Sequence, residues 1–172
     1  MMRIATAFLV RVHRIGRLCG LALAALLALP GCVARDVVAT DSSGYLADAN
    51  RLVAAIDWDK AATVAIVLSE YDYAPSELTF HPGTPYRLHL TNHGFEVHDF
   101  SSKPFFQAIA VAKMVDLKTM ATTSLPRLVS IGVGPGEAKD LYFIPMRPGS
   151  YPFECDEPLY ATFGMTGTVR VE

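Results

Sequence analysis

Three residues that lie far apart in the chain carry the side-chain types of a mononuclear copper centre. Such a centre needs two imidazoles and a thiolate in a trigonal plane, with a weak thioether as axial ligand. His98 lies in a polar turn segment, Cys155 ends the segment Tyr151-Pro-Phe-Glu-Cys155, and Met165 follows shortly after it. The second imidazole is missing, because the chain has Pro158-Leu-Tyr160 where that histidine would be expected.

The tyrosine at position 160 leaves three outcomes open. A phenol has an ordinary pKa of about 10, so Tyr160 could bind copper only if the metal displaced its proton, and it would then favour Cu(II). Water, Asp156 or Glu157 could instead supply the fourth donor, or copper could be absent and the fold kept for another purpose. His93 could reach the neighbourhood of the metal, although a solvent-facing turn histidine is the simpler interpretation.

The first 31 residues have the pattern of a secretory signal. Four arginines precede an apolar run from Leu18 to Leu29 that is too short to cross a bilayer comfortably. The run ends in Leu-Pro-Gly-Cys32, which resembles the lipobox of bacterial lipoproteins and predicts a lipid on Cys32. Residues 32–43 would then be a polar tether. We therefore expect the protein at the periplasmic face of the bacterial cell envelope, attached to a membrane through its N-terminal lipid.

The remaining composition is that of one mildly acidic domain. The signal holds four of the 15 basic residues and none of the 17 acidic ones, so the rest of the chain has 11 basic and 17 acidic residues and a net charge of −6. No cluster of Lys and Arg remains to follow a phosphate backbone, which argues against nucleic acid as a partner. Beyond the signal and the lipid site, Cys155 is the only cysteine, so this domain can form no internal disulfide. We expect a monomer.

The spacing of apolar residues predicts a short helix followed by an all-β domain. Residues 44–60 carry apolar side chains at helical spacing, which indicates a short amphipathic helix that packs on the domain. Over residues 61–172 the period is mainly two, and frequent Gly and Pro turns predict a Greek-key β-sandwich. The predicted strands are Thr63–Leu68, Glu77–Phe80, Tyr86–Thr91, Val97–Ser101, Arg127–Val133, Lys139–Pro145, Tyr151–Cys155 and Thr166–Val171. The exception is Pro104–Met114, which we interpret as a short helix inserted after the histidine loop.

Three motifs resemble the cupredoxin family, which includes azurin and plastocyanin. They are Asn92-x-Gly-x-x-x-His98-Asp-Phe, Tyr-x-Phe-x-Cys155, and Gly164-Met165-x-Gly-x-Val-x-Val171, within a similarity that covers Thr63 to Glu172. The resemblance implies a Greek-key sandwich of eight strands that binds one copper ion and passes single electrons. It implies His98, Cys155 and Met165 as ligands, with Tyr160 in the place of the second histidine. It also implies that Asn92 ties the two ligand loops together by hydrogen bonding near Cys155.

Three classes of function follow from these residues. The first is a membrane-tethered electron carrier with an atypical copper site, which would serve an unidentified periplasmic redox protein. The second is a protein that stores or delivers copper, and the third is a metal-free interaction module on the same scaffold. Paired carboxylates, a nucleophile motif and a second copper cluster are all lacking in the sequence, so we do not expect an enzyme.

Overall fold

The computed structural model describes residues 40–124 and 127–172. The predicted signal (1–31), the lipid site Cys32 and the tether as far as residue 39 lie outside the described residues. Within the described part of the chain, no helix is both long enough and apolar enough to cross a membrane.

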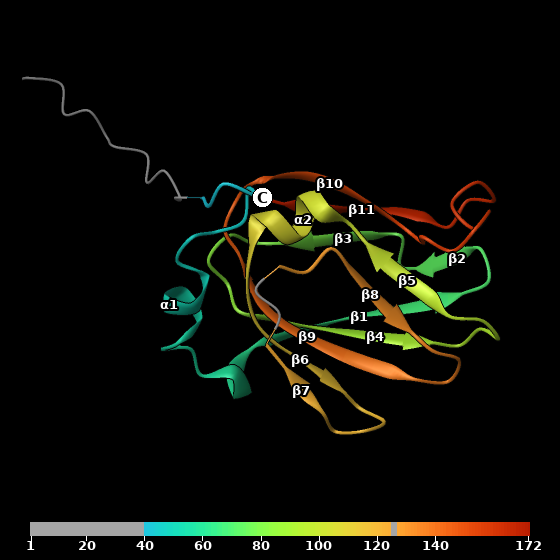
Figure 1. The fold of residues 1–172 in the computed structure, drawn as a ribbon, viewed down its shortest axis with the longest axis horizontal. Helices are drawn as coiled ribbons and strands as arrows, with labels where there is room; N and C mark the ends of the chain where they lie inside the picture. Colours follow the sequence, from blue (N-terminus) through green and yellow to red (C-terminus); the bar gives the residue numbers. More distant parts are fainter. Residues whose placement is uncertain (1–39, 125–126) are drawn as a thin grey trace, which may run out of the picture. The chain divides into compact units, whose positions relative to one another are not determined.

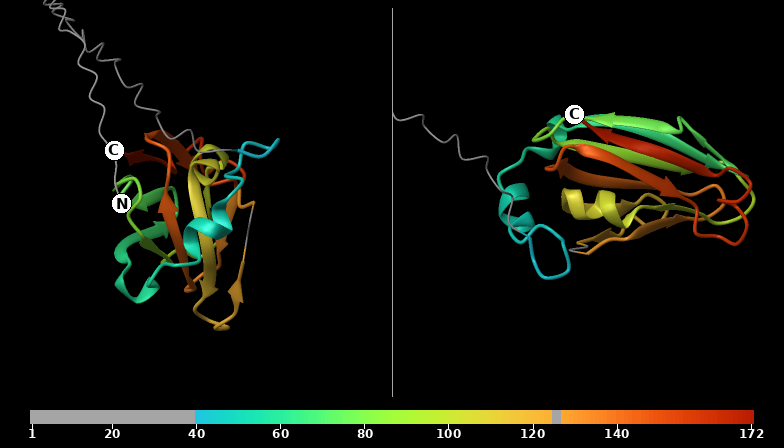
Figure 2. Two further views of the ribbon diagram at one scale, coloured as in Figure 1. Left: turned by 90° about the vertical axis from the view of Figure 1, so that its left-hand side faces the viewer. Right: turned by 90° about the horizontal axis from the view of Figure 1, so that it is seen from above.

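Two β-sheets pack against each other in the described residues (Figures 1 and 2). The first sheet has the strand order β2 (Asp72–Ala74), β1 (Ala62–Ser69), β4 (Tyr86–Asn92), β9 (Ala138–Pro145), β6 (Ile109–Asp116) and β7 (Thr122–Thr123). The second has the order β3 (Glu77–Phe80), β11 (Thr166–Val171), β10 (Gly149–Glu154), β5 (His98–Ser101) and β8 (Ser130–Val133). The predicted all-β sandwich is confirmed. Each of the eight predicted strands is present, with bounds that differ by a few residues.

The alternation of buried and more exposed residues shows why the strand predictions succeeded. In β4, Tyr86, Leu88 and Leu90 are buried while Arg87, His89 and Thr91 are only partly buried. Successive side chains of a strand point to opposite faces of the sheet, so this pattern places one face in the core. The β4 strand pairs in parallel with β1 and antiparallel with β9, which holds it in the middle of the first sheet.

The core between the sheets is rich in phenylalanine. The largest fully buried rings come from both sheets and from the helix α2 (Lys103–Ala108), and they contact one another at centroid distances of 4.6–6.2 Å. These rings are Phe80, Phe100, Phe105, Phe106, Phe143 and Phe153. Their packing holds β5 and β10, the two strands that carry His98 and lead to Cys155, at a defined position in the second sheet.

The first predicted helix is much shorter than expected. Helix α1 covers only Ala49–Val53, and a single 3₁₀ turn follows at Trp58–Lys60. The apolar residues around it pack in a small cluster on Ala110 and Ile144 of the first sheet, as the amphipathic pattern predicted. Gly44 adopts a positive φ of 88°, and Thr40 pairs with Leu46, so tight turns rather than a continuous helix bring these side chains to the sheet.

The predicted helix at Pro104–Met114 is right in its first half and wrong in its second. Helix α2 begins at Lys103, with the Ser102 hydroxyl accepting a hydrogen bond from Phe105 N–H, and ends at Ala108. From Ile109 the chain is strand β6, which pairs with β9 from Ile109 opposite Pro145 to Asp116 opposite Lys139. Pairing with a distant strand outweighs the local helical pattern here. Strands β2, β6 and β7 were not predicted.

Candidate metal centre

Three connections meet at one end of the sandwich, at the right-hand side of Figure 1. They are the histidine loop between β4 and β5, the loop between β10 and β11, and the turn between β1 and β2. Tyr71 of the turn stacks on Tyr160 of the β10–β11 loop, with ring centroids 4.9 Å apart. Phe95 of the histidine loop donates its backbone N–H to the Glu70 carboxylate of the same turn. Side chains from distant parts of the sequence therefore share one small region.

His98 is the first residue of β5, and its side chain is completely buried. Neither of its ring nitrogens has a hydrogen-bond partner in the described residues, although both are inaccessible to solvent. Buried polar atoms in proteins are nearly always paired. An imidazole held in this way fits the role of a metal ligand, because its lone pair is not used by another protein group.

Cys155 follows the last residue of β10, and its thiol is buried beside the histidine strand. The backbone N–H of Asp99, the residue after His98, donates to Cys155 Sγ at 3.4 Å. Burial raises the pKa of the Cys155 thiol, while the backbone N–H groups of Asp99 and Glu157 partly offset that rise. The thiol is therefore protonated at neutral pH unless a cation drives off its proton.

Met165 and Tyr160 complete the inner side of the β10–β11 loop. Met165 is fully buried, its carbonyl accepts the N–H of Cys155 at 3.2 Å, and its own N–H donates to the Tyr160 carbonyl at 3.0 Å. The Tyr160 ring stands nearly edge-on to the His98 ring, with centroids 5.2 Å apart. Hydrogen bonds and ring contacts thus link the segments that carry His98, Cys155, Met165 and Tyr160.

The phenol of Tyr160 is held in its neutral form. Burial of the hydroxyl raises the pKa of Tyr160, and the nearby Tyr71, Glu96 and Glu70 raise it further. A phenolate ligand would have to form against this shift. The other candidate donors are more exposed than His98, Cys155 and Met165, which are all buried. His93 and Asp156 are exposed, and Glu157 is half-buried.

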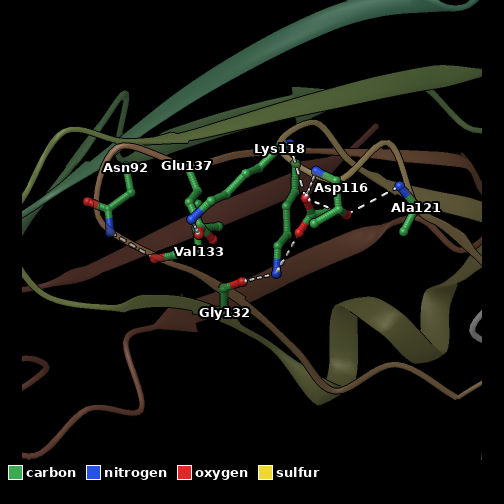
Figure 3. A network of polar contacts seen from close by, with 9 residues as sticks. Asn92, Asp116, Lys118, Ala121, Gly132, Val133 and Glu137 are labelled. Carbon is green, nitrogen blue, oxygen red and sulfur yellow. Dashed lines mark hydrogen bonds and ion pairs between the residues drawn. The ribbon is translucent and has the colours of Figure 1, made fainter.

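Asn92 has a different role from the one that the family resemblance implied. Its side chain is 1% exposed, and it donates to the carbonyls of Glu96 at 2.7 Å and Val133 at 2.8 Å, the latter drawn in Figure 3. Its Oδ1 accepts the N–H of Gly94 at 2.7 Å. These bonds tie the end of β4 to the histidine loop and to β8, and they do not reach the loop of Cys155. The link between the two ligand loops is made instead by Asp99 N–H.

Sequence reasoning missed Glu70. Its Oε1 lies 3.6 Å from His98 Nε2, and it also accepts the N–H of Phe95. The Phe95 N–H is the main reason that the pKa of Glu70 lies below its ordinary value. Nothing in the sequence marked this carboxylate among 17 acidic residues, because its position depends on how β1 pairs with β4.

The donor set can be compared with what copper needs. In the described residues no group of three or more His, Cys, Asp and Glu side chains could hold a metal ion. The candidate donors here are His98 and Cys155 together with the thioether of the buried Met165. One imidazole, one thiolate and one thioether suit copper in chemical type, but they are one imidazole short of the common four-ligand set.

The two sheets and their strand order define a cupredoxin-like fold, the fold of small copper proteins and of copper-oxidase domains. Neither a protein-family model nor a curated protein matches the chain. Among solved structures, the copper nitrite reductase from Nitrosomonas europaea matches with a TM-score of 0.51 and 15% identity over 66% of this chain. The McoA multicopper oxidase from Aquifex aeolicus matches with a TM-score of 0.50 and 14% identity over 68% of this chain.

Auracyanin from the photosynthetic bacterium Roseiflexus castenholzii matches over nearly its whole length. It has a TM-score of 0.45 and 20% identity, over 65% of this chain and 98% of that protein. By contrast, the similarity covers only 50% of the nitrite reductase chain and 30% of the McoA chain. At these identities the similarity establishes the fold alone.

Proposed function

We propose that this chain is a copper-binding protein that carries single electrons rather than an enzyme. The observation that carries this proposal is that the buried imidazole of His98 has no hydrogen-bond partner among the described residues, while the N–H of the next residue, Asp99, donates to the Cys155 thiol. Copper bound at such a place supplies one-electron chemistry between Cu(I) and Cu(II). His98, Cys155 and Met165 would hold it, with Tyr160 as a neutral neighbour.

The surrounding residues suit that task. Asp99 N–H and Glu157 N–H favour negative charge on the Cys155 sulfur, so they assist loss of its proton when a cation binds. The Tyr160 ring covers one side of His98 and restricts the approach of water. The ligand loops are joined by backbone hydrogen bonds to the sandwich, which keeps rearrangement during electron transfer small.

The surface around the site suits a redox partner. Exposed apolar side chains lie on the three loops of this end, and they are Tyr71, Phe95, Val97, Leu159 and Phe163. Phe95 is 86% exposed, and a cluster of exposed apolar side chains is typical of a surface that binds a partner. The loops carry Glu70, Glu96, Asp156 and Glu157 and contain no Lys or Arg. A periplasmic redox protein with an apolar contact surface ringed by basic residues would complement this face.

Attachment to the membrane belongs to the same proposal. The lipobox-like sequence at Cys32 would anchor the domain through its acyl chains, and the segment up to residue 43 would let it reach partners near the membrane. Mass spectrometry of the membrane-extracted protein should show a lipid-modified N-terminal Cys32. An unmodified cysteine, or a chain that begins elsewhere, would contradict the anchor.

Storage or delivery of copper is the second candidate, and one observation favours it. Because the pKa of Tyr160 is raised, a neutral phenol leaves the soft thiolate and thioether as the dominant donors. Soft sulfur ligands prefer Cu(I). Such a site would bind Cu(I) tightly and would give no reversible one-electron wave.

Copper titration with visible spectroscopy and voltammetry tests both functions. We expect the wild-type chain to bind copper with a weak or altered thiolate-to-copper absorption band and a reversible wave. Tyr160→His should move the band toward that of an ordinary blue copper site, whereas Tyr142→His, on β9 beside Trp58, should not. Tight Cu(I) binding without a reversible wave would favour storage. A wild-type chain that binds no copper would refute both functions.

A further inference from the structure

A carboxylate, an imidazole and a glycine backbone meet at the base of the histidine loop. Glu70 lies just after β1, and its Oε1 is 3.6 Å from Nε2 of His98. The same oxygen accepts the backbone N–H of Phe95, so the histidine loop itself holds the carboxylate in place. Glu70 is only partly exposed, while the His98 ring is completely buried.

Gly94 is what allows this approach. A Cβ atom at position 94 would lie 2.5 Å from Glu70 Oε1 and 2.6 Å from His98 Nε2, which is closer than real Cβ contacts come. The carboxylate and the imidazole therefore both pack against the bare backbone of Gly94, and Asn92 holds that backbone by accepting the Gly94 N–H. Any larger residue would separate Glu70 from His98.

The position of Glu70 discriminates between the two ring nitrogens. A neutral imidazole has one N–H donor and one acceptor nitrogen, and the group beside one nitrogen decides which of the two carries the hydrogen. Glu70 lies beside Nε2, whereas no carboxylate in the described part of the chain is paired with Nδ1. A distance of 3.6 Å is longer than a good hydrogen bond, but a small rotation of either side chain would close it.

We propose that Glu70 is a positioning residue that accepts the Nε2–H of His98 and thereby leaves Nδ1 free to bind the metal. The metal-binding half of this inference rests on the proposed function, whereas the choice of tautomer does not. Groups that fix the ring nitrogen opposite the metal orient the ligand and raise its basicity, and their loss typically lowers metal affinity about 10- to 100-fold.

Nitrogen-15 NMR of the full chain in detergent, measured without metal, tests the tautomer directly. We expect wild type to hold His98 in the Nε2–H form, and Glu70→Gln to keep that form because its amide oxygen still accepts. Glu70→Ala should give a mixture of both tautomers. Glu77→Ala is the matched control, because Glu77 is an exposed carboxylate at the start of β3. An Nδ1–H form in the wild-type chain would overturn the proposal even if Glu70→Ala failed to fold.

Copper affinity supplies the second measurement. Glu70→Ala should bind copper about 10- to 100-fold more weakly than wild type, with Glu70→Gln in between and Glu77→Ala unchanged. An unchanged tautomer and an unchanged affinity in Glu70→Ala would refute the role of Glu70. If instead the wild type showed the Nε2–H form but bound no copper, the proposed function would fail while the assignment of Glu70 to the tautomer would stand.

Discussion

Replacing Asn92, the last residue of β4, by alanine should destabilise the fold more than a change of any polar side chain in the histidine loop. The Asn92 side chain is 1% exposed and makes three hydrogen bonds, to the Glu96 carbonyl, the Val133 carbonyl and the Gly94 N–H. Alanine would leave all three groups without that partner. Because Glu96 is exposed, water can replace Asn92 at the Glu96 carbonyl, but Gly94 and Val133 are buried.

The size of the effect follows from those two buried groups. Leaving a buried hydrogen-bonding group unpaired costs about 1–3 kcal/mol, so two such groups give an expected loss of about 3 kcal/mol in the free energy of unfolding. The loss should appear as a lower urea midpoint with an unchanged slope, because the surface exposed on unfolding hardly changes.

Urea denaturation of the full chain, followed by circular dichroism, would measure this loss. Asn50→Ala is the matched control, because Asn50 is an exposed asparagine in α1 and its replacement should change the free energy of unfolding by less than about 0.5 kcal/mol. A loss below about 1 kcal/mol for Asn92→Ala would refute the reasoning, because it would mean that the loop keeps its shape without these bonds.

Two further predictions concern a strained residue and an acidic side chain. Leu159 is 65% exposed and has a φ of 74°, a backbone conformation that costs a residue with a side chain about 1–2 kcal/mol. Glycine would remove this cost but would also make the unfolded chain more flexible, so Leu159→Gly should raise the free energy of unfolding by about 0.5–1 kcal/mol. Leu159→Ala should not raise it. Thermal or urea unfolding of the two variants checks this, and equal stabilities would contradict it. The pKa of Asp41 is lowered from 3.8 to about 2, chiefly because the Ser43 hydroxyl donates to its carboxylate and also because the backbone N–H groups of Ser43 and Tyr45 do so. The stability that this shift contributes is present above pH 3.8 and is lost as the pH falls toward 2. The difference in the free energy of unfolding between wild type and Asp41→Asn should therefore shrink over that interval. A difference that does not depend on pH would refute this prediction.

The β-strands around the core were predictable because their signal is local. The alternation of apolar and polar residues in β4 indicates one buried face, and the Gly and Pro residues indicate tight turns. Both signals depend only on residues that are close together in the sequence. Strand β6 was missed for the opposite reason. The segment from Ile109 is compatible with a helix by itself, and only its pairing with β9, some 30 residues away, makes it a strand.

The candidate ligands could be proposed from the sequence, but their surroundings could not. The order of His98, Cys155 and Met165 and the type of residue at position 160 are properties of the sequence alone, and they determined what chemistry the site could support. The protonation of Tyr160 depends on burial beside Glu96 and Glu70, which no sequence pattern describes.

Residue types and local periodicity were thus enough to predict the fold class and to propose His98, Cys155 and Met165 as candidate donors. The folded chain was needed to show that Glu70 lies against His98 over the bare backbone of Gly94, and that Asn92 bonds to β8 instead of the cysteine loop. The physical reason is distance along the chain. The periodicity of apolar residues indicates which face of a strand is buried. Contacts between loops depend on how the strands pair and how the two sheets pack, and no short stretch of residues specifies either.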